Sequence, residues 1–123
     1  MDSKILIVDD DPEICELVSM ALTGKGLIVR TAMSGEDGLK SYGEFKPDVV
    51  LLDHRLQDTN GVEVAKKMKC CDTGKKTNII MMSGSDTMEI ELDPDLFDGS
   101  LKKPFKLSEL NEYLKKFLRK NGL

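Results

Sequence analysis

Charged and polar side chains follow several short apolar runs of this sequence, and together they could carry out phosphoryl chemistry. Three consecutive acids, Asp9 to Asp11, come directly after the first run, and Asp53 ends another. Ser83 follows a third run, and Lys103 stands close to where the last one ends. Carboxylates about 4 Å apart repel each other by roughly 4 kcal/mol at an effective dielectric constant near 20. A cluster of them therefore raises its own pKa values or binds a cation.

The cation and the other groups of this set indicate one kind of reaction. Hard carboxylate oxygens with few other ligands favour Mg²⁺, which keeps several waters and shares its shell with phosphate oxygens. A lysine ammonium and a hydroxyl group suit the oxygens of a phosphoryl group. One carboxylate of the cluster can be the nucleophile that accepts that group. The residue types therefore indicate magnesium-dependent phosphoryl transfer.

The strands that would position these groups lie far apart in the sequence. Short apolar runs predict strands over residues 4–8, 27–31, 48–53 and 78–82, with a fifth ending near Lys102. The run over residues 48–53 is continuous, as in a parallel strand buried on both faces. No two-residue Asp-Gly or Asn-Gly hairpin joins two strands, which favours crossover connections.

Helices are predicted between these strands. Apolar residues at helical spacing predict helices over residues 12–24, 34–42 and 107–118, and one more after Gly61. The expected N-caps are Asp11, Ser34 and Ser108. Any helix within residues 86–99 is expected to be short, because Asp93-Pro94-Asp95 would interrupt it.

The alternation of strands and helices predicts an α/β fold. Right-handed crossovers turn this order into a doubly wound, five-stranded parallel sheet with helices on both faces. Ligands of such sheets bind beyond the carboxyl ends of the strands. The acids, the hydroxyl and the lysine named above are therefore expected to meet at one edge of the sheet.

Composition narrows the classes of function. The chain has 123 residues, which fits one domain. Its net charge of −4 argues against direct binding to nucleic acid or to an anionic membrane. The apolar run over residues 5–8 is too short for a signal peptide or a membrane span, so we expect a cytoplasmic protein. Cys15, Cys70 and Cys71 form no disulfide framework, and the single His54 cannot complete a zinc site.

Taken in order along the chain, these residues resemble the receiver domain of two-component response regulators. That domain has a flavodoxin-like fold with strand order 2-1-3-4-5, which chemotaxis receivers exemplify. The resemblance covers nearly the whole chain and implies a single receiver domain over residues 1–123. Its five matching features are the doublet Asp9-Asp10, Asp53 at the end of the third strand, Gly61 eight residues later, Ser83 thirty residues after Asp53, and Lys103-Pro104-Phe105.

The resemblance implies an acceptor and a metal site. Asp53 would accept a phosphoryl group from a sensor histidine kinase. Asp9, Asp10 and Asp53 would hold Mg²⁺ together with the backbone carbonyl of Arg55, with Asp10 as the most direct ligand. The domain would be a signalling module rather than an ordinary enzyme, with self-catalysed phosphotransfer and autodephosphorylation only.

The resemblance also implies how the phosphoryl group is bound and read. Lys103 would pair with the phosphoryl oxygens, and Ser83 would hydrogen-bond the phosphoryl group and act as the switch. Pro104 would follow a cis peptide bond in a tight turn. Phosphorylation would change binding to a downstream protein whose identity the sequence leaves open, or would produce a phosphorylation-dependent dimer.

Three features depart from the usual pattern of that family. Gln57 stands where a proline is common in the loop after the acceptor. Ser100, three residues before Lys103, stands where the family usually has Tyr or Phe. The region of residues 86–98 is short and acidic. We therefore expect an intact acceptor site and an altered output face.

Two other interpretations use the same residues. A haloacid-dehalogenase-type phosphatase also has an Asp nucleophile and Mg²⁺, but it needs a second acid two residues later, where this chain has Arg55. A pseudo-receiver, an interaction module with the same fold that is not phosphorylated, is the main alternative. A Mg²⁺-dependent response to beryllofluoride would distinguish a receiver from a pseudo-receiver.

Overall fold

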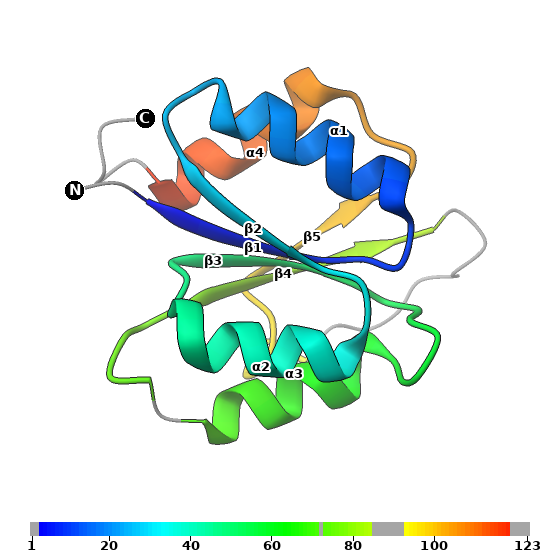
Figure 1. Ribbon diagram of the computed structural model, residues 1–123, viewed down its shortest axis with the longest axis vertical. Helices are drawn as coiled ribbons and strands as arrows, with labels where there is room; N and C mark the ends of the chain where they lie inside the picture. The colour runs from blue at the N-terminus through cyan, green and yellow to red at the C-terminus, as the bar shows by residue number, and fades with distance from the viewer. Residues whose placement is uncertain (1–2, 72, 85–92, 119–123) are drawn as a thin grey trace.

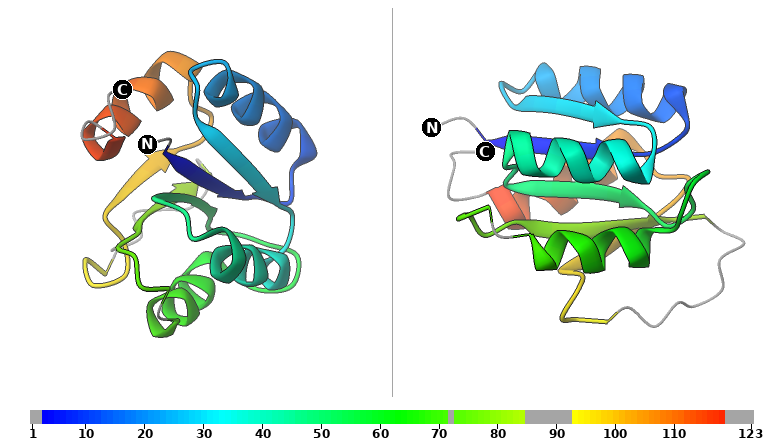
Figure 2. Two further views of the ribbon diagram at one scale, coloured as in Figure 1. Left: turned by 60° about the vertical axis from the view of Figure 1, so that its left-hand side comes forward. Right: turned by 60° about the horizontal axis from the view of Figure 1, so that its bottom comes forward.

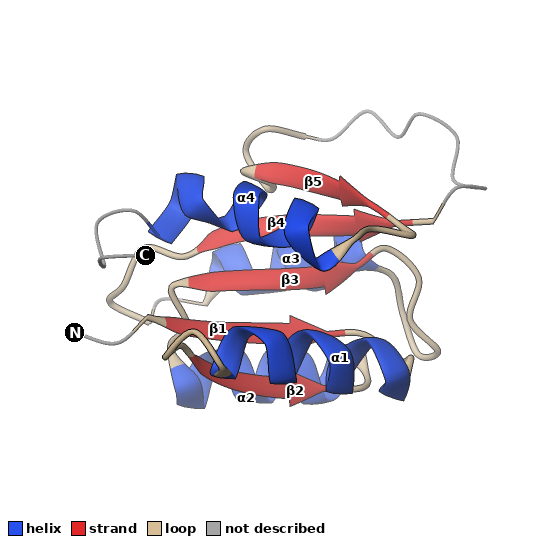
Figure 3. Ribbon diagram, turned by 90° about the horizontal axis from the view of Figure 1, so that it is seen from above, coloured by secondary structure: helices blue, strands red, loops and turns tan. Residues whose placement is uncertain are grey.

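Five parallel strands form the centre of the molecule in a computed structural model that describes residues 3–71, 73–84 and 93–118. They are β1 (Lys4–Val8), β2 (Ile28–Ala32), β3 (Val49–Asp53), β4 (Asn78–Ser83) and β5 (Gly99–Lys102). The strand order is β2-β1-β3-β4-β5, which confirms the predicted order 2-1-3-4-5 (Figure 1). Because all neighbouring strands pair in parallel, their carboxyl ends lie at the same edge of the sheet (Figure 3).

Helices cover both faces of this sheet (Figures 1 and 2). One pair, α1 (Pro12–Thr23) and α4 (Leu107–Leu118), packs on one face. The other pair, α2 (Gly35–Phe45) and α3 (Gly61–Cys70), packs on the opposite face. In the described part of the chain, no helix has the length and hydropathy that a membrane span requires.

The strand residues divide between two apolar cores. Along β1, Ile5 and Ile7 pack toward α1 and α4, whereas Leu6 and Val8 pack toward α2 and α3. All four side chains are fully buried. Alternation across a two-sided sheet explains why the run over residues 5–8 is apolar at every position. The rigid central strands hold the residues that follow them in fixed positions.

Two of the predicted N-caps are confirmed. Asp11 accepts a hydrogen bond from the N–H of Glu13 at 2.9 Å, and Pro12 follows it as the first helical residue. Ser34 accepts from the N–H of Asp37 at 3.0 Å. The third was wrong: α4 begins at Leu107, so Ser108 lies inside its first turn. There the carboxylate of Glu109 accepts from the N–H of Lys106 at 3.4 Å.

Some boundaries differ from the prediction. Helix α2 continues to Phe45 rather than ending near Tyr42, because the ring of Phe45 packs against the core beneath α2 and α3. Lys46 then ends the helix in the left-handed conformation, with φ of 52°. Of the segment for which a short helix was expected, residues 86–92 lie outside the described residues. The three cysteines are free thiols, as expected.

Candidate functional site

Three carboxylates meet at the carboxyl edge of the sheet. Asp53 is the last residue of β3, and Asp9 and Asp10 follow β1. The parallel register pairs Val8 with Leu52, so Asp9 comes to lie beside Asp53. One carboxylate oxygen from each acid lies within 4.8 Å of the other two. Asp9 is fully buried, Asp53 is 7% exposed, and Asp10 is half-buried, so the cluster opens to solvent mainly on the side of Asp10.

Lys103, which directly follows the edge strand β5, brings a positive charge into this cluster. Its Nζ donates a hydrogen bond to Asp9 Oδ2 at 2.6 Å and lies 3.4 Å from Asp53 Oδ1. The backbone N–H of Lys103 donates to the carbonyl of Ser83 at 2.6 Å. The peptide bond between Lys103 and Pro104 is cis, which confirms the expected turn. Lys103 lies beside two acids that are 50 or more positions away in the sequence.

Burial and neighbouring charges shift the pKa values of Asp53 and Lys103. Burial, and next the charge of Asp9, raise the pKa of Asp53 from 3.8 to about 6, against the opposing charge of Lys103. Burial alone would lower the pKa of Lys103, but its hydrogen bond to Asp9 and the charges of both acids raise it on balance. Among the described residues, three carboxylates face the ammonium of Lys103, and this excess of negative charge with oxygen donors suits a divalent cation.

The carboxylate of Asp9 is the most fully engaged of the three. Its Oδ1 accepts from the N–H of Asp11 at 2.9 Å, while its Oδ2 accepts from Lys103. The Cys15 thiol donates to the carbonyl of Asp9 at 3.2 Å. Burial, followed by the charges of Asp9 and Asp11, raises the pKa of Cys15 to about 11. This support of Asp9 by Cys15 was not predicted, because a cysteine within an apolar helical stripe is the same pattern as simple core packing.

Close packing against Asp53 and His54 requires glycine at position 61. A Cβ atom at this position would lie 2.7 Å from the carbonyl oxygen of Asp53 and 3.2 Å from the Cα of His54. The N–H of Gly61 donates to the carbonyl of His54 at 2.8 Å. The start of α3 therefore contacts the backbone at the end of β3, which only glycine permits here. This explains the glycine eight residues after Asp53.

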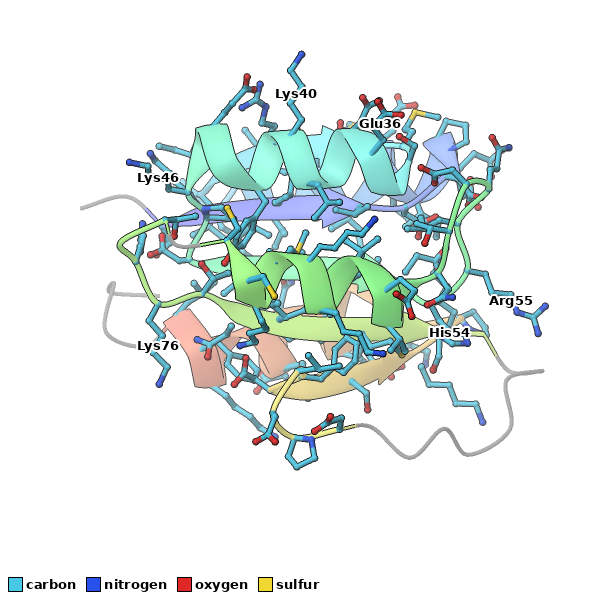
Figure 4. All side chains as sticks on the ribbon, turned by 90° about the horizontal axis from the view of Figure 1, so that it is seen from below. Glu36, Lys40, Lys46, His54, Arg55 and Lys76 are labelled. Atoms are coloured by element: carbon cyan, nitrogen blue, oxygen red, sulfur yellow. The ribbon has the colours of Figure 1, made fainter. Side chains whose placement is uncertain are left out.

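The remaining candidate residues lie around the same edge. Ser83 ends β4 directly after Met82, which pairs with Asp53, and its side chain is half-buried. Arg55 begins the loop after β3, and its side chain extends away from the body of the molecule (Figure 4). His54 is half-buried, and its Nδ1 is buried with no hydrogen-bond partner in the described part of the chain.

Comparison with protein families and curated proteins gives one consistent result. A family model described as "Response regulator receiver domain" matches residues 5–115. The DNA-binding response regulator MtrA of Mycolicibacterium smegmatis is 34% identical over 123 residues, covering 98% of this chain and 53% of that protein. The sensor histidine kinase AtsR of Burkholderia thailandensis is 34% identical over 113 residues, covering 89% of this chain and 19% of that protein. The chain thus spans about half the length of MtrA and a smaller part of AtsR.

Solved structures give the same result. A CheY-like response regulator receiver domain from Methylobacillus flagellatus has a TM-score of 0.86 at 26% identity, over 95% of this chain and 99% of that one. The chemotaxis protein CheY4 of Vibrio cholerae has a TM-score of 0.82 at 28% identity, over 96% of this chain and 100% of that one. The five-stranded fold and its helices are therefore shared along nearly the whole length of both chains.

Proposed function

The chain belongs to the response regulator receiver domain family, and from this premise we propose that Asp53 is the residue that accepts the phosphoryl group. The observation that carries the proposal is the position of its carboxylate. Asp53 ends β3 beside two other acids and 3.4 Å from the ammonium of Lys103. We extend the proposal to residues 1–123 as one receiver domain.

The reaction would transfer the group from a phosphohistidine of a sensor histidine kinase. A carboxylate oxygen of Asp53 forms a bond to phosphorus, and the bond between phosphorus and the histidine nitrogen breaks, with the electron pair staying on that nitrogen. Lys103 is close enough to pair with the oxygens of the new acyl phosphate. The hydroxyl of Ser83, at the end of the neighbouring strand, would hydrogen-bond the same group.

The donor set also fits Mg²⁺, because it offers carboxylate oxygens and an uncompensated negative charge. Asp9, Asp10 and Asp53 would hold the ion with the backbone carbonyl of Arg55. Asp10 would be the most direct ligand, since both carboxylate oxygens of Asp9 already accept hydrogen bonds. The bound ion would neutralise charge on the carboxylates and on the incoming phosphoryl oxygens.

Signal output is part of the same proposal. Phosphorylation would alter contacts with a downstream protein or favour a dimer, and autodephosphorylation would reset the domain. No other catalytic activity is proposed. MtrA is named as a DNA-binding protein and is about twice as long as this chain. For this chain, the expectation that it makes no direct contact with nucleic acid stays a prediction.

Beryllofluoride tests the proposal against the pseudo-receiver alternative. Backbone NMR spectra would be recorded with Mg²⁺ alone, with beryllofluoride alone, and with both. A receiver gives additional saturable shifts around Asp53, Ser83 and Lys103, beyond those that Mg²⁺ alone causes, only when both are present. A pseudo-receiver gives spectra with both reagents that match those with Mg²⁺ alone.

A further inference from the structure

The N-terminus of α2 is capped by a residue from another part of the chain. The first N–H groups of a helix have no partner within it, and the N-cap side chain usually satisfies one of them. Here Ser34 accepts from the N–H of Asp37 at 3.0 Å. Asp58 takes the two preceding donors: its Oδ1 accepts from Gly35 at 2.8 Å and its Oδ2 from Glu36 at 3.0 Å.

These two hydrogen bonds favour an ionised Asp58. The N–H groups of Gly35 and Glu36, in that order, lower the pKa of Asp58 below its usual value. The positive end of the helix dipole acts in the same direction. At neutral pH the carboxylate therefore remains a charged acceptor for both donors.

Packing supports the same contact independently of charge. A Cβ atom on Gly35 would lie 2.2 Å from Cγ2 of Thr59 and 3.0 Å from Cγ2 of Val64. A larger residue at position 35 would force the side chain of Thr59 to move. Gly35 and Asp58 therefore both contribute to the close contact between the start of α2 and the loop after β3.

The loop that Asp58 holds in this way begins directly after Asp53. His54 at its start accepts from Gly61 at 2.8 Å, Leu56 donates to Thr59 at 3.1 Å, and Arg55 forms a bridge with Asn60. Figure 4 shows Glu36, His54 and Arg55 at the same end of the molecule, opposite Lys46 and Lys76. Because these hydrogen bonds join the two sides of the loop, holding Asp58 in place also restrains residues 54–56.

We propose that Asp58 is a positioning residue for the phosphoacceptor site. By capping α2 it holds the loop that carries Arg55, whose backbone carbonyl would be a ligand of the ion. Asp58 thereby supplies a restraint in a loop where Gln57 replaces a proline. It touches neither the ion nor the phosphoryl group. This inference rests on the proposed function, since it assumes that the Arg55 carbonyl is a ligand.

The test compares two caps of the same helix. Asp58→Ala removes the cap that reaches from the loop, whereas Ser34→Ala removes the cap that the helix supplies itself. Both variants lose N-cap hydrogen bonds, so both should melt a few degrees below the wild type. Mg²⁺ affinity is measured by titration calorimetry, and amide exchange of residues 54–60 is measured in the metal-free protein.

The two variants should differ at the metal site. Asp58→Ala should weaken Mg²⁺ binding by about tenfold, as outer-shell changes commonly do, and should speed exchange in the loop. Ser34→Ala should leave both quantities at wild-type values. Equal Mg²⁺ affinities in all three proteins, or equal losses in the two variants, would overturn the positioning role.

Failure of the proposed function would look different. Wild-type protein that binds no Mg²⁺ at the three acids would contradict the metal site itself. The exchange measurement would then still decide whether Asp58 holds the loop. Faster loop exchange in Asp58→Ala alone supports the restraint, and unchanged exchange refutes it.

Discussion

The ammonium of Lys103 is bonded to Asp9 at 2.6 Å and stands farther, at 3.4 Å, from Asp53. Asp9 is fully buried, so this bond compensates a charge that water cannot reach. The charge of Asp53 is compensated less well, which agrees with its raised pKa. In this arrangement the lysine stabilises the fold before it meets any phosphoryl group.

Lys103→Met should therefore destabilise the domain strongly. It leaves the buried carboxylate of Asp9 without its partner, and loss of one member of a buried pair costs about 3–5 kcal/mol. Lys102→Met is the matched control, because Lys102 is the adjacent, exposed lysine. Urea unfolding of both variants checks this, and equal losses of free energy would contradict the role of the bond.

The raised pKa of Asp53 predicts a pH dependence of stability. Burial favours the protonated acid in the folded state, so this stabilising contribution is complete below about pH 4 and is lost as pH rises through about 6. In metal-free protein, Asp53→Asn should therefore gain stability relative to wild type between pH 5 and pH 7.5, by about 1.4 kcal/mol. Urea unfolding of both proteins at the two pH values measures this gain. A difference that does not change with pH would argue against the shift.

Asp10→Asn should separate repulsion from metal binding. In metal-free protein it removes one of three clustered negative charges, so the melting temperature should rise. Added Mg²⁺ should then stabilise the variant far less than it stabilises wild type. Asp95→Asn, at an exposed acid away from the cluster, serves as the control and should show the wild-type response. A full Mg²⁺ response in Asp10→Asn would place the ion elsewhere.

Gly61→Ala tests the close approach of α3 to the end of β3. The new Cβ would meet the backbone of Asp53 and His54, neither of which can rotate away, so we expect a loss of about 1–3 kcal/mol. Gly43→Ala is the control, since a Cβ there meets no atom within 4 Å and alanine favours the helix. The control should be neutral or more stable than wild type in thermal unfolding. Loss of stability in both variants would show that the contact is not the cause.

The residues that end strands could be predicted because the central strands are unambiguous. Residues 5–8 are apolar at every position, which fixes β1 and so places Asp9 and Asp10 beyond it. The same reasoning places Asp53 after β3. Caps were harder to place: Asp11 was confirmed, but a serine in the first turn, such as Ser108, looks the same in sequence as an N-cap.

Contacts between distant segments were beyond prediction from one sequence. Asp58 is one polar residue in a polar loop, and nothing near it in the chain indicates that it meets Gly35 and Glu36. The contact of Tyr113 could not be predicted either. Its hydroxyl accepts a hydrogen bond from the N–H of Ser100 at 2.9 Å and occupies the space that a Cβ on Gly99 would need. Such pairs depend on how elements pack, which periodicity does not specify.

The most direct test of the account is to locate the phosphoryl group. Wild type, Asp53→Asn and the control Asp95→Asn are treated with acetyl phosphate in the presence and absence of Mg²⁺, and intact protein and peptides are analysed by mass spectrometry. We expect a single Mg²⁺-dependent phosphoryl adduct in wild type and control, located at Asp53 and missing from Asp53→Asn. An undiminished adduct in Asp53→Asn, or none in wild type with Mg²⁺, would contradict this expectation.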